Sequence, residues 1–300
     1  MWSCIAWFLF ATMGIPGSGT GATVPDPGTP IVAVRLERHD IYDLDDPATS
    51  ALPYRWVNAL HALTREGFIR SLLLFEVGDP LDPLALAESE LILRRTGFLN
   101  PVTISARPAP GGAEVVVETH DQWTIDVDVS YDVSGDRKRS GGSISDDNLL
   151  GWGKSVSFGM ESDPDRDSME LGYKDRTVLG SRWQVDLKYT DSSDGSESFL
   201  RVQYPFFALR TPRAGGVEWR QLDSVEYLWS DATRRVSGAA DRRNFEVWFG
   251  MRLPGESIRT DRLIAGVFGE QARYGAWRRD DGTPYPQPVN RDLLGPVVGW

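Results

Sequence analysis

The most constraining feature of the sequence is a run of strict alternation between Trp123 and Val133. Its apolar positions are Trp123, Ile125, Val127, Val129, Tyr131 and Val133, and its polar positions include Asp126, Asp128 and Asp132. Because successive side chains of a strand point to opposite faces, this run predicts a β-strand with one apolar face and one carboxylate-rich face. Such a strand belongs either to a sheet covering a soluble core or to a barrel wall between lipid and a wet lumen.

Residues 31–121, which precede this run, predict a small α+β module of order β-α-α-β-β with a core of its own. Helices are expected where apolar residues recur at helical spacing between Pro and Gly signals, and Asp82 is expected to cap the second one. The expected elements are a strand beginning at 31, a helix from Pro53 to Gly67, an extended connection at 68–77, a helix after Asp82, and strands at 102–106 and 113–119.

After Trp123 the helical period disappears, and alternating runs recur through residue 300. The pattern predicts about ten or eleven antiparallel strands over residues 122–300. Many runs have about the length of a tilted strand that crosses the hydrocarbon of a bilayer, and Trp183 and Tyr189 bound one of them as interfacial aromatics would. These features favour a transmembrane β-barrel over a soluble sandwich or a looser array of strands.

The N-terminus predicts export. An apolar run from Ile5 to Met13 is followed by Gly and Pro breakers and by small residues up to Ala22, so residues 1–22 are expected to be a signal peptide and residues 23–30 a linker. Cys4 is the only cysteine, which leaves the predicted mature chain without disulfides or a cysteine nucleophile. The net charge of −11 argues against nucleic acid as a partner.

Three segments carry a resemblance to a known family. Phe68–Leu99, Val115–Ile125 and Asp146–Gly153 resemble, in order and spacing, the POTRA-to-barrel region of the Omp85 superfamily (bacterial surface antigen D15, BamA/TamA-like proteins). In the last segment the resemblance is to the turn after the second barrel strand, and its residues here are Asn148, Leu149, Leu150, Gly151 and Gly153.

This resemblance implies a single POTRA-like module in the periplasm and a barrel in the bacterial outer membrane. Its implied partners are outer-membrane lipid and unfolded polypeptide clients, with periplasmic chaperones and accessory lipoproteins as further candidates. The resemblance implies a barrel that closes with sixteen strands and carries an Arg-Gly-Phe type motif in a late loop. This chain contains no Arg-Gly dipeptide. The barrel is therefore expected to be incomplete, and the chain to be a truncated or fragmentary sequence.

The expected function is insertion or translocation of polypeptides, with client strands pairing at an edge of the module and at the first barrel strand through Trp123, Ile125, Val127, Val129 and Tyr131. Asp126, Asp128 and Asp132 are expected to face the lumen. The alternatives are a two-partner secretion pore for a dedicated substrate, a soluble periplasmic β-sandwich that binds a ligand, and an exported phospholipase that lacks its enzyme domain.

No catalytic, cofactor-binding or metal-binding residue is predicted. His39, His61 and His120 are spread over the N-terminal module, and both His39 and His120 precede an aspartate. A His-Asp pair can serve acid–base chemistry or metal binding. These two pairs flank predicted strand ends, where solvated or structural histidines are expected, so the chain is not expected to be an enzyme.

Overall fold

The computed structural model describes residues 25–135, 137–230, 233–255 and 260–299. The expected signal peptide, residues 1–22, lies outside these ranges. The described part of the expected linker is held to the module, since Gly28 N–H donates to Leu81 O (2.9 Å) and Leu81 N–H donates to Thr29 O (2.8 Å). None of the described helices is long and apolar enough to cross a membrane.

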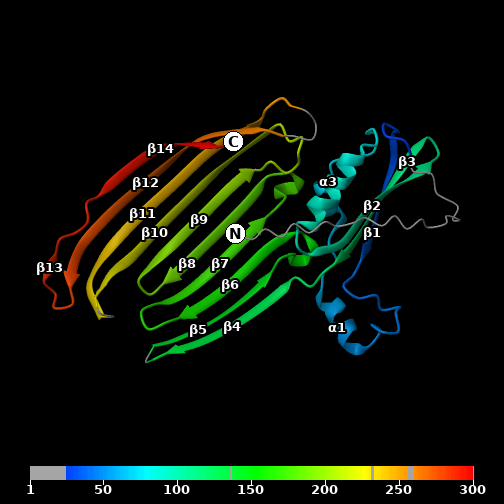
Figure 1. The fold of residues 1–300 in the computed structure, drawn as a ribbon. Helices are drawn as coiled ribbons and strands as arrows, with labels where there is room; N and C mark the ends of the chain where they lie inside the picture. The colour runs from blue at the N-terminus through cyan, green and yellow to red at the C-terminus, as the bar shows by residue number, and fades with distance from the viewer. Residues whose placement is uncertain (1–24, 136, 231–232, 256–259, 300) are drawn as a thin grey trace, which may run out of the picture.

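The N-terminal module contains three helices beside a three-stranded sheet (Figure 1). In chain order its elements are β1 (Ile31–His39), α1 (Leu52–Leu60), α2 (Glu66–Leu72), α3 (Pro83–Arg94), β2 (Leu99–Ala109) and β3 (Gly112–Asp121). The strand order is β1-β3-β2, with β1 parallel and β2 antiparallel to β3. The last strand in sequence is therefore the central one.

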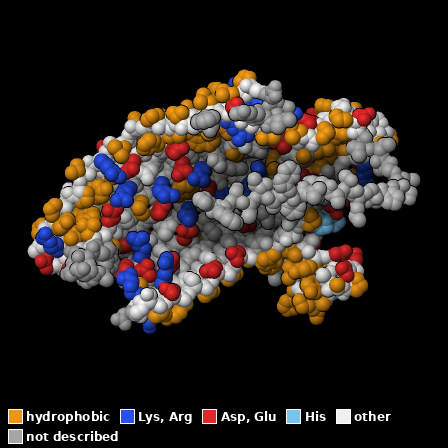
Figure 2. All heavy atoms as spheres, in the orientation of Figure 1, with side chains coloured by type: hydrophobic (Ala, Val, Ile, Leu, Met, Phe, Trp, Pro, Cys, Tyr) orange, Lys and Arg blue, Asp and Glu red, His pale blue; other side chains and the backbone are white. Residues whose placement is uncertain are grey.

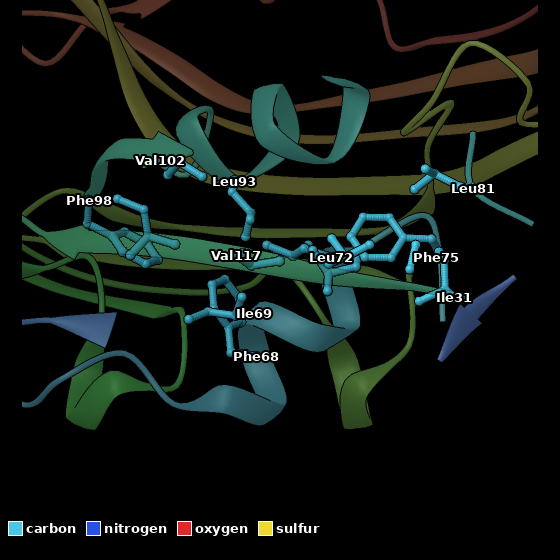
Figure 3. Close-up of a cluster of buried hydrophobic side chains, with 14 residues drawn as sticks. Ile31, Phe68, Ile69, Leu72, Phe75, Leu81, Leu93, Phe98, Val102 and Val117 are labelled. Carbon is cyan, nitrogen blue, oxygen red and sulfur yellow. The ribbon is translucent and has the colours of Figure 1, made fainter. Parts of the chain in front are cut away.

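The core of the module lies between this sheet and the helices (Figure 3). Ile69 and Leu93 of the helices are fully buried, as are Val115 and Val117 of β3. The rings of Phe68 and Phe98 lie 5.8 Å apart beside them. Apolar side chains on alternate positions of β3 thus meet helical stripes, which gives the module the separate core that its pattern predicts.

Two local predictions in the module were wrong. The first helix ends at Leu60, and residues Glu66–Leu72 form α2 where an extended connection was expected. Gly67 does not stop a helix; it lies in the first turn of α2, where a backbone N–H needs no helical partner. The helix after Asp82 is confirmed, and the Asp82 side chain accepts the Leu84 N–H at 3.0 Å as its N-cap.

The remainder of the described chain forms one antiparallel sheet of eleven strands, in agreement with the predicted number. The strands are β4 (Ile125–Ser134), β5 (Arg137–Asp146), β6 (Lys154–Ser162), β7 (Asp167–Asp175), β8 (Gln184–Ser192), β9 (Gly195–Tyr204), β10 (Arg213–Ser230), β11 (Thr233–Arg252), β12 (Arg262–Arg279), β13 (Pro284–Tyr285) and β14 (Arg291–Gly299). Neighbours in sequence pair in space from β4 to β13, and β14 pairs with β12. The sequence pattern predicts two separate strands at 232–238 and 245–251, whereas the structure has a single long strand, β11.

The large sheet curves around a hollow and carries opposite chemistry on its two faces. Figure 2 shows acidic and basic side chains gathered inside the hollow and hydrophobic ones along the outer rim. The outward side chains are large and exposed, for example Val129 with 82% of its surface accessible. In a soluble sandwich the apolar faces of two sheets cover each other. The described strands instead form a partial β-barrel with its apolar face outward.

Candidate functional site

The first strand of the sheet, β4, forms one of its edges. In the described residues β4 pairs on one side only, with β5, and β14 at the opposite edge pairs only with β12. An edge strand presents a row of backbone N–H and C=O groups that can pair with another chain. Among the described strands, the side of β4 away from β5 therefore carries backbone N–H and C=O groups without a strand partner.

The predicted pairing residues mostly lie on this strand. Val127, Val129 and Tyr131 are exposed on its outer face, and Ile125 is half-buried at its start. Trp123 lies outside the strand, which begins at Ile125, so the prediction that Trp123 belongs to this strand was wrong. The chain around Trp123 is still bonded to the module, because Gln122 N–H donates to Phe98 O at 2.8 Å.

The three predicted lumen carboxylates share the other face of β4. In the register with β5, Asp126 lies opposite Ser145, Asp128 opposite Ser143 and Asp132 opposite Arg139. The same face continues across the sheet as rows of ion pairs. These include Arg139–Glu161, Lys188–Glu170 (3.0 Å), Arg201–Glu218 (2.6 Å) and Arg220–Glu197 (3.3 Å).

The turn between β5 and β6 holds the sheet against the module. Leu150 (φ 52°), Gly151 (φ 74°) and Gly153 (φ 66°) have left-handed backbone conformations. A Cβ on Gly151 would stand 2.4 Å from Leu63 O, and one on Gly153 would stand 2.0 Å from the Phe68 ring. The glycines of the predicted turn motif are therefore required by both backbone conformation and close contact with the module.

A buried polar network connects the turn between β5 and β6 with the N-terminal module. Asp121 Oδ2, at the end of β3, accepts hydrogen bonds from Thr64 N–H and Thr64 Oγ1, both at 2.7 Å, and lies 2.8 Å from His61 Nε2. Asn148 Nδ2 donates to Thr64 Oγ1 at 2.7 Å, and Asn148 Oδ1 accepts the Gly153 N–H at 2.7 Å. The Asn of the turn motif thus joins the module to the sheet.

Two further turns at the same end of the sheet also contact the module. Arg182 lies in the turn between β7 and β8 and donates to Leu73 O. Its guanidinium lies 4.4 Å from the ring centroid of Phe207. Burial lowers the pKa of the Arg182 guanidinium below its ordinary value. In the next turn, Leu209 N–H donates to Glu88 of α3 at 2.7 Å.

The docked module and the inner wall of the sheet line an open cleft with a volume of about 400 Å³. Leu72 and Ile92 contribute its module side, and Asp186, Arg201 and Gln203 contribute its sheet side. Arg95 adds a charge on the module side, and a cleft with charged groups on both walls is suited to water and to polar backbone rather than to a tightly held apolar ligand.

The possible pairing edges of the module follow from its strand order. Ala113–Thr119 lies within the central strand β3 and is occupied on both sides, so of the two expected strands only Val102–Arg107 in β2 is at an edge. There, α3 covers part of the edge. Arg94 donates to Val102 O (2.8 Å), Glu90 accepts the Ile104 N–H (3.2 Å), and these two side chains form an ion pair at 2.7 Å.

The fold and this interface together define a class: a partial β-barrel whose module docks through helices and loops onto the turns at one end of the sheet. Neither a scan of protein-family models nor a search of curated proteins found a match. Solved structures similar to this chain include BamA from Haemophilus ducreyi lacking POTRA domains 1–3, at 12% identity and a TM-score of 0.43, covering 85% of this chain and 57% of that one.

A second similar structure is CdiB from Acinetobacter baumannii, at 10% identity and a TM-score of 0.40. That alignment covers 80% of this chain and 40% of CdiB. The chain therefore spans less than two thirds of the length of either protein.

Proposed function

We propose that this chain is part of an Omp85-type outer-membrane protein that inserts or translocates polypeptides, with its N-terminal module in the periplasm. The observation that carries the proposal is that β4, which is separated from the end of β3 by three residues, pairs on one side only among the described strands. A client segment would add to this edge by main-chain hydrogen bonding, with its side chains alternating between the outer face and the hollow.

The two faces of the sheet support a membrane location. The outer face presents Val129, Phe158, Leu171 and Val247 to its surroundings, while the inner face carries ion pairs. In hydrocarbon, an outward apolar face is favourable and inward charges can remain hydrated. Cell fractionation combined with heat-modifiable gel mobility tests this location. Recovery of the protein as a soluble periplasmic species would contradict it.

Unpaired backbone groups explain why an incoming strand would be favoured at β4. In hydrocarbon an unsatisfied N–H or C=O costs several kcal/mol, so a free edge is stabilised by any strand that pairs with it. The ends of a client strand would also contact polar side chains in the hollow, including Asp126 and Asp128. Pairing at β2 of the module is a second expected contact, and it requires the Glu90–Arg94 pair to move away from the edge.

Disulfide trapping tests the pairing directly. Cys4 is the only native cysteine and lies in the expected signal peptide, so single cysteines can be placed in the sheet. Ser130→Cys lies on the edge strand β4 and Ser157→Cys lies on β6, which is paired on both sides. A client with one cysteine should crosslink to the first variant and not to the second, because a disulfide needs Cα atoms within about 7 Å. Equal crosslinking of both variants would contradict pairing at β4.

The two-partner secretion alternative uses the same fold and differs in its client. Depletion of the protein separates the two functions. A general assembly role predicts lower levels of many outer-membrane proteins, whereas a dedicated pore predicts loss of one secreted substrate and unchanged porin levels. The soluble β-sandwich is disfavoured, because no second sheet covers the apolar face of the large sheet within the described part of the chain.

A further inference from the structure

Two histidines that are distant in sequence meet on the outer face of the module sheet. His39 is the last residue of β1 and His120 is the penultimate residue of β3, and the parallel register places them directly opposite each other. Their imidazole rings are stacked, with centroids 4.3 Å apart and planes inclined by 15°. They lie on the face opposite the apolar core, where solvent has access.

A carboxylate completes the cluster. Glu118 precedes His120 by two residues on β3, so both side chains point to the same face. Its Oε1 atom lies 3.5 Å from His39 Nε2 and 3.3 Å from His120 Nε2. The potential ligand atoms of the three residues all lie within 4.8 Å of one another.

These separations match those of a metal site. Zn²⁺ binds imidazole nitrogen at about 2.0–2.1 Å in tetrahedral geometry, which places neighbouring ligand atoms about 3.3–3.4 Å apart. The two measured N–O separations are already close to this value. Because imidazole lone pairs lie in the ring planes and the two rings are stacked, the rings would have to turn about their side-chain torsions until both Nε2 lone pairs converge on an ion placed between the three atoms.

We propose that His39, Glu118 and His120 form a binding site for a divalent transition-metal ion, with Zn²⁺ as the best fit. Two imidazoles and one carboxylate suit Zn²⁺ and related ions, whereas Ca²⁺ and Mg²⁺ require more oxygen ligands. The three residues leave a fourth tetrahedral position that water would fill. The exposure of His39 gives the ion a path to the site.

The position of the site suggests what the ion would do. β1 is an edge strand of the module, and His39 is its last residue before the chain turns away toward α1. An ion shared with His120 would fasten the end of β1 to the central strand, one residue before the buried Asp121. Metal binding would thus stabilise the module beside its junction with the large sheet. This inference stands independently of the proposed client.

Calorimetric titration with Zn²⁺ tests the proposal on the full chain, purified without a histidine tag, refolded in detergent and stripped with a chelator. We expect saturable binding of one Zn²⁺ per chain and a rise in the melting temperature of the module, because a ligand that binds only the folded state stabilises it. His39→Gln and His120→Gln should each abolish this binding and this rise. Glu118→Gln should weaken both.

Glu114→Gln is the matched control, since Glu114 lies on the same strand and the same face as Glu118, four residues further from the site. It should bind Zn²⁺ like the unaltered chain. Circular dichroism and limited proteolysis of each variant establish that the module is folded. Absence of saturable binding to the folded chain, or unchanged affinity in the folded His39→Gln and His120→Gln variants, would overturn the proposal and leave a hydrogen-bonded histidine pair.

Discussion

Gly153 packs against the ring of Phe68 so closely that a Cβ on Gly153 would stand 2.0 Å from Phe68 Cε2. Gly153 belongs to the turn between β5 and β6, and Phe68 belongs to helix α2 of the module. The contact between these two residues therefore fixes how near the module lies to the sheet.

Gly153→Ala should separate the module from the sheet. The added methyl group overlaps the Phe68 ring, and an alanine at φ 66° is strained, so we expect a loss of about 1–3 kcal/mol in stability. Faster proteolysis between residues 121 and 125 measures the separation. Gly159→Ala is the control, because its Cβ would meet Ser143 Cβ at an ordinary 3.7 Å. Similar proteolysis of both variants would contradict the role of the contact.

Asp121→Ala should be among the most destabilising single changes in the module. The substitution leaves His61 and both Thr64 donors buried without their acceptor, and breaking a buried interaction of this kind costs about 3–5 kcal/mol. Denaturant unfolding followed by tryptophan fluorescence measures the loss. Asp126→Ala, on the exposed inner face of β4, should change stability by about 0.5 kcal/mol or less. A small effect of Asp121→Ala would mean that water replaces the network.

Asp82 has two separable roles. It caps α3 through the Leu84 N–H and forms an ion pair with Arg210 in the turn between β9 and β10. Asp82→Ala should cost about 1–2 kcal/mol through loss of the cap, whereas Arg210→Ala should cost about 0–1 kcal/mol because the pair is solvent-exposed. Asp82→Asn keeps the cap and should behave like Arg210→Ala. Thermal melts of the three variants compare these values, and an equal loss in all three would assign the stability to the ion pair.

The edge of β2 should become more accessible when its covering side chains are removed. A Glu90→Ala, Arg94→Ala double variant frees Val102 O and Ile104 N–H, the two backbone groups that an added strand would use first. Crosslinking of a client cysteine to Thr103→Cys should then increase severalfold. Arg95→Ala in place of the double variant should leave crosslinking unchanged. If the double variant also leaves it unchanged, clients do not pair with this edge.

Local patterns predicted most of the fold. Alternation such as that of Val127 and Val129 arises because one face of a strand is hydrated and the other is not. The strands of the large sheet could therefore be predicted from the sequence. Helix α2 could not be predicted, because a glycine such as Gly67 usually indicates the end of a helix. Packing against the module core determines that Gly67 lies in the first turn of a helix instead. The length of β11 was missed because its middle, around Asp241 to Asn244, lacks apolar alternation.

The contacts of the candidate site were less accessible to sequence reasoning. The turn motif around Asn148 was found by resemblance, but its partners Thr64 and Phe68 belong to a different part of the chain. The pairing of His39 with His120 depends on a parallel register between strands that are separated by three helices and a third strand. Nothing in the residues adjacent to either histidine encodes that register.

The central place of β3 in the module has a mechanical consequence. β3 is bonded to strands on both of its sides and runs, through residues 122–124, straight into β4. A pull on β4 would load β3 along its length, and all of its lateral hydrogen bonds would have to shear together before it moved. The module therefore acts as an anchor for β4, and movement of this strand would begin at its far end, near Ser134.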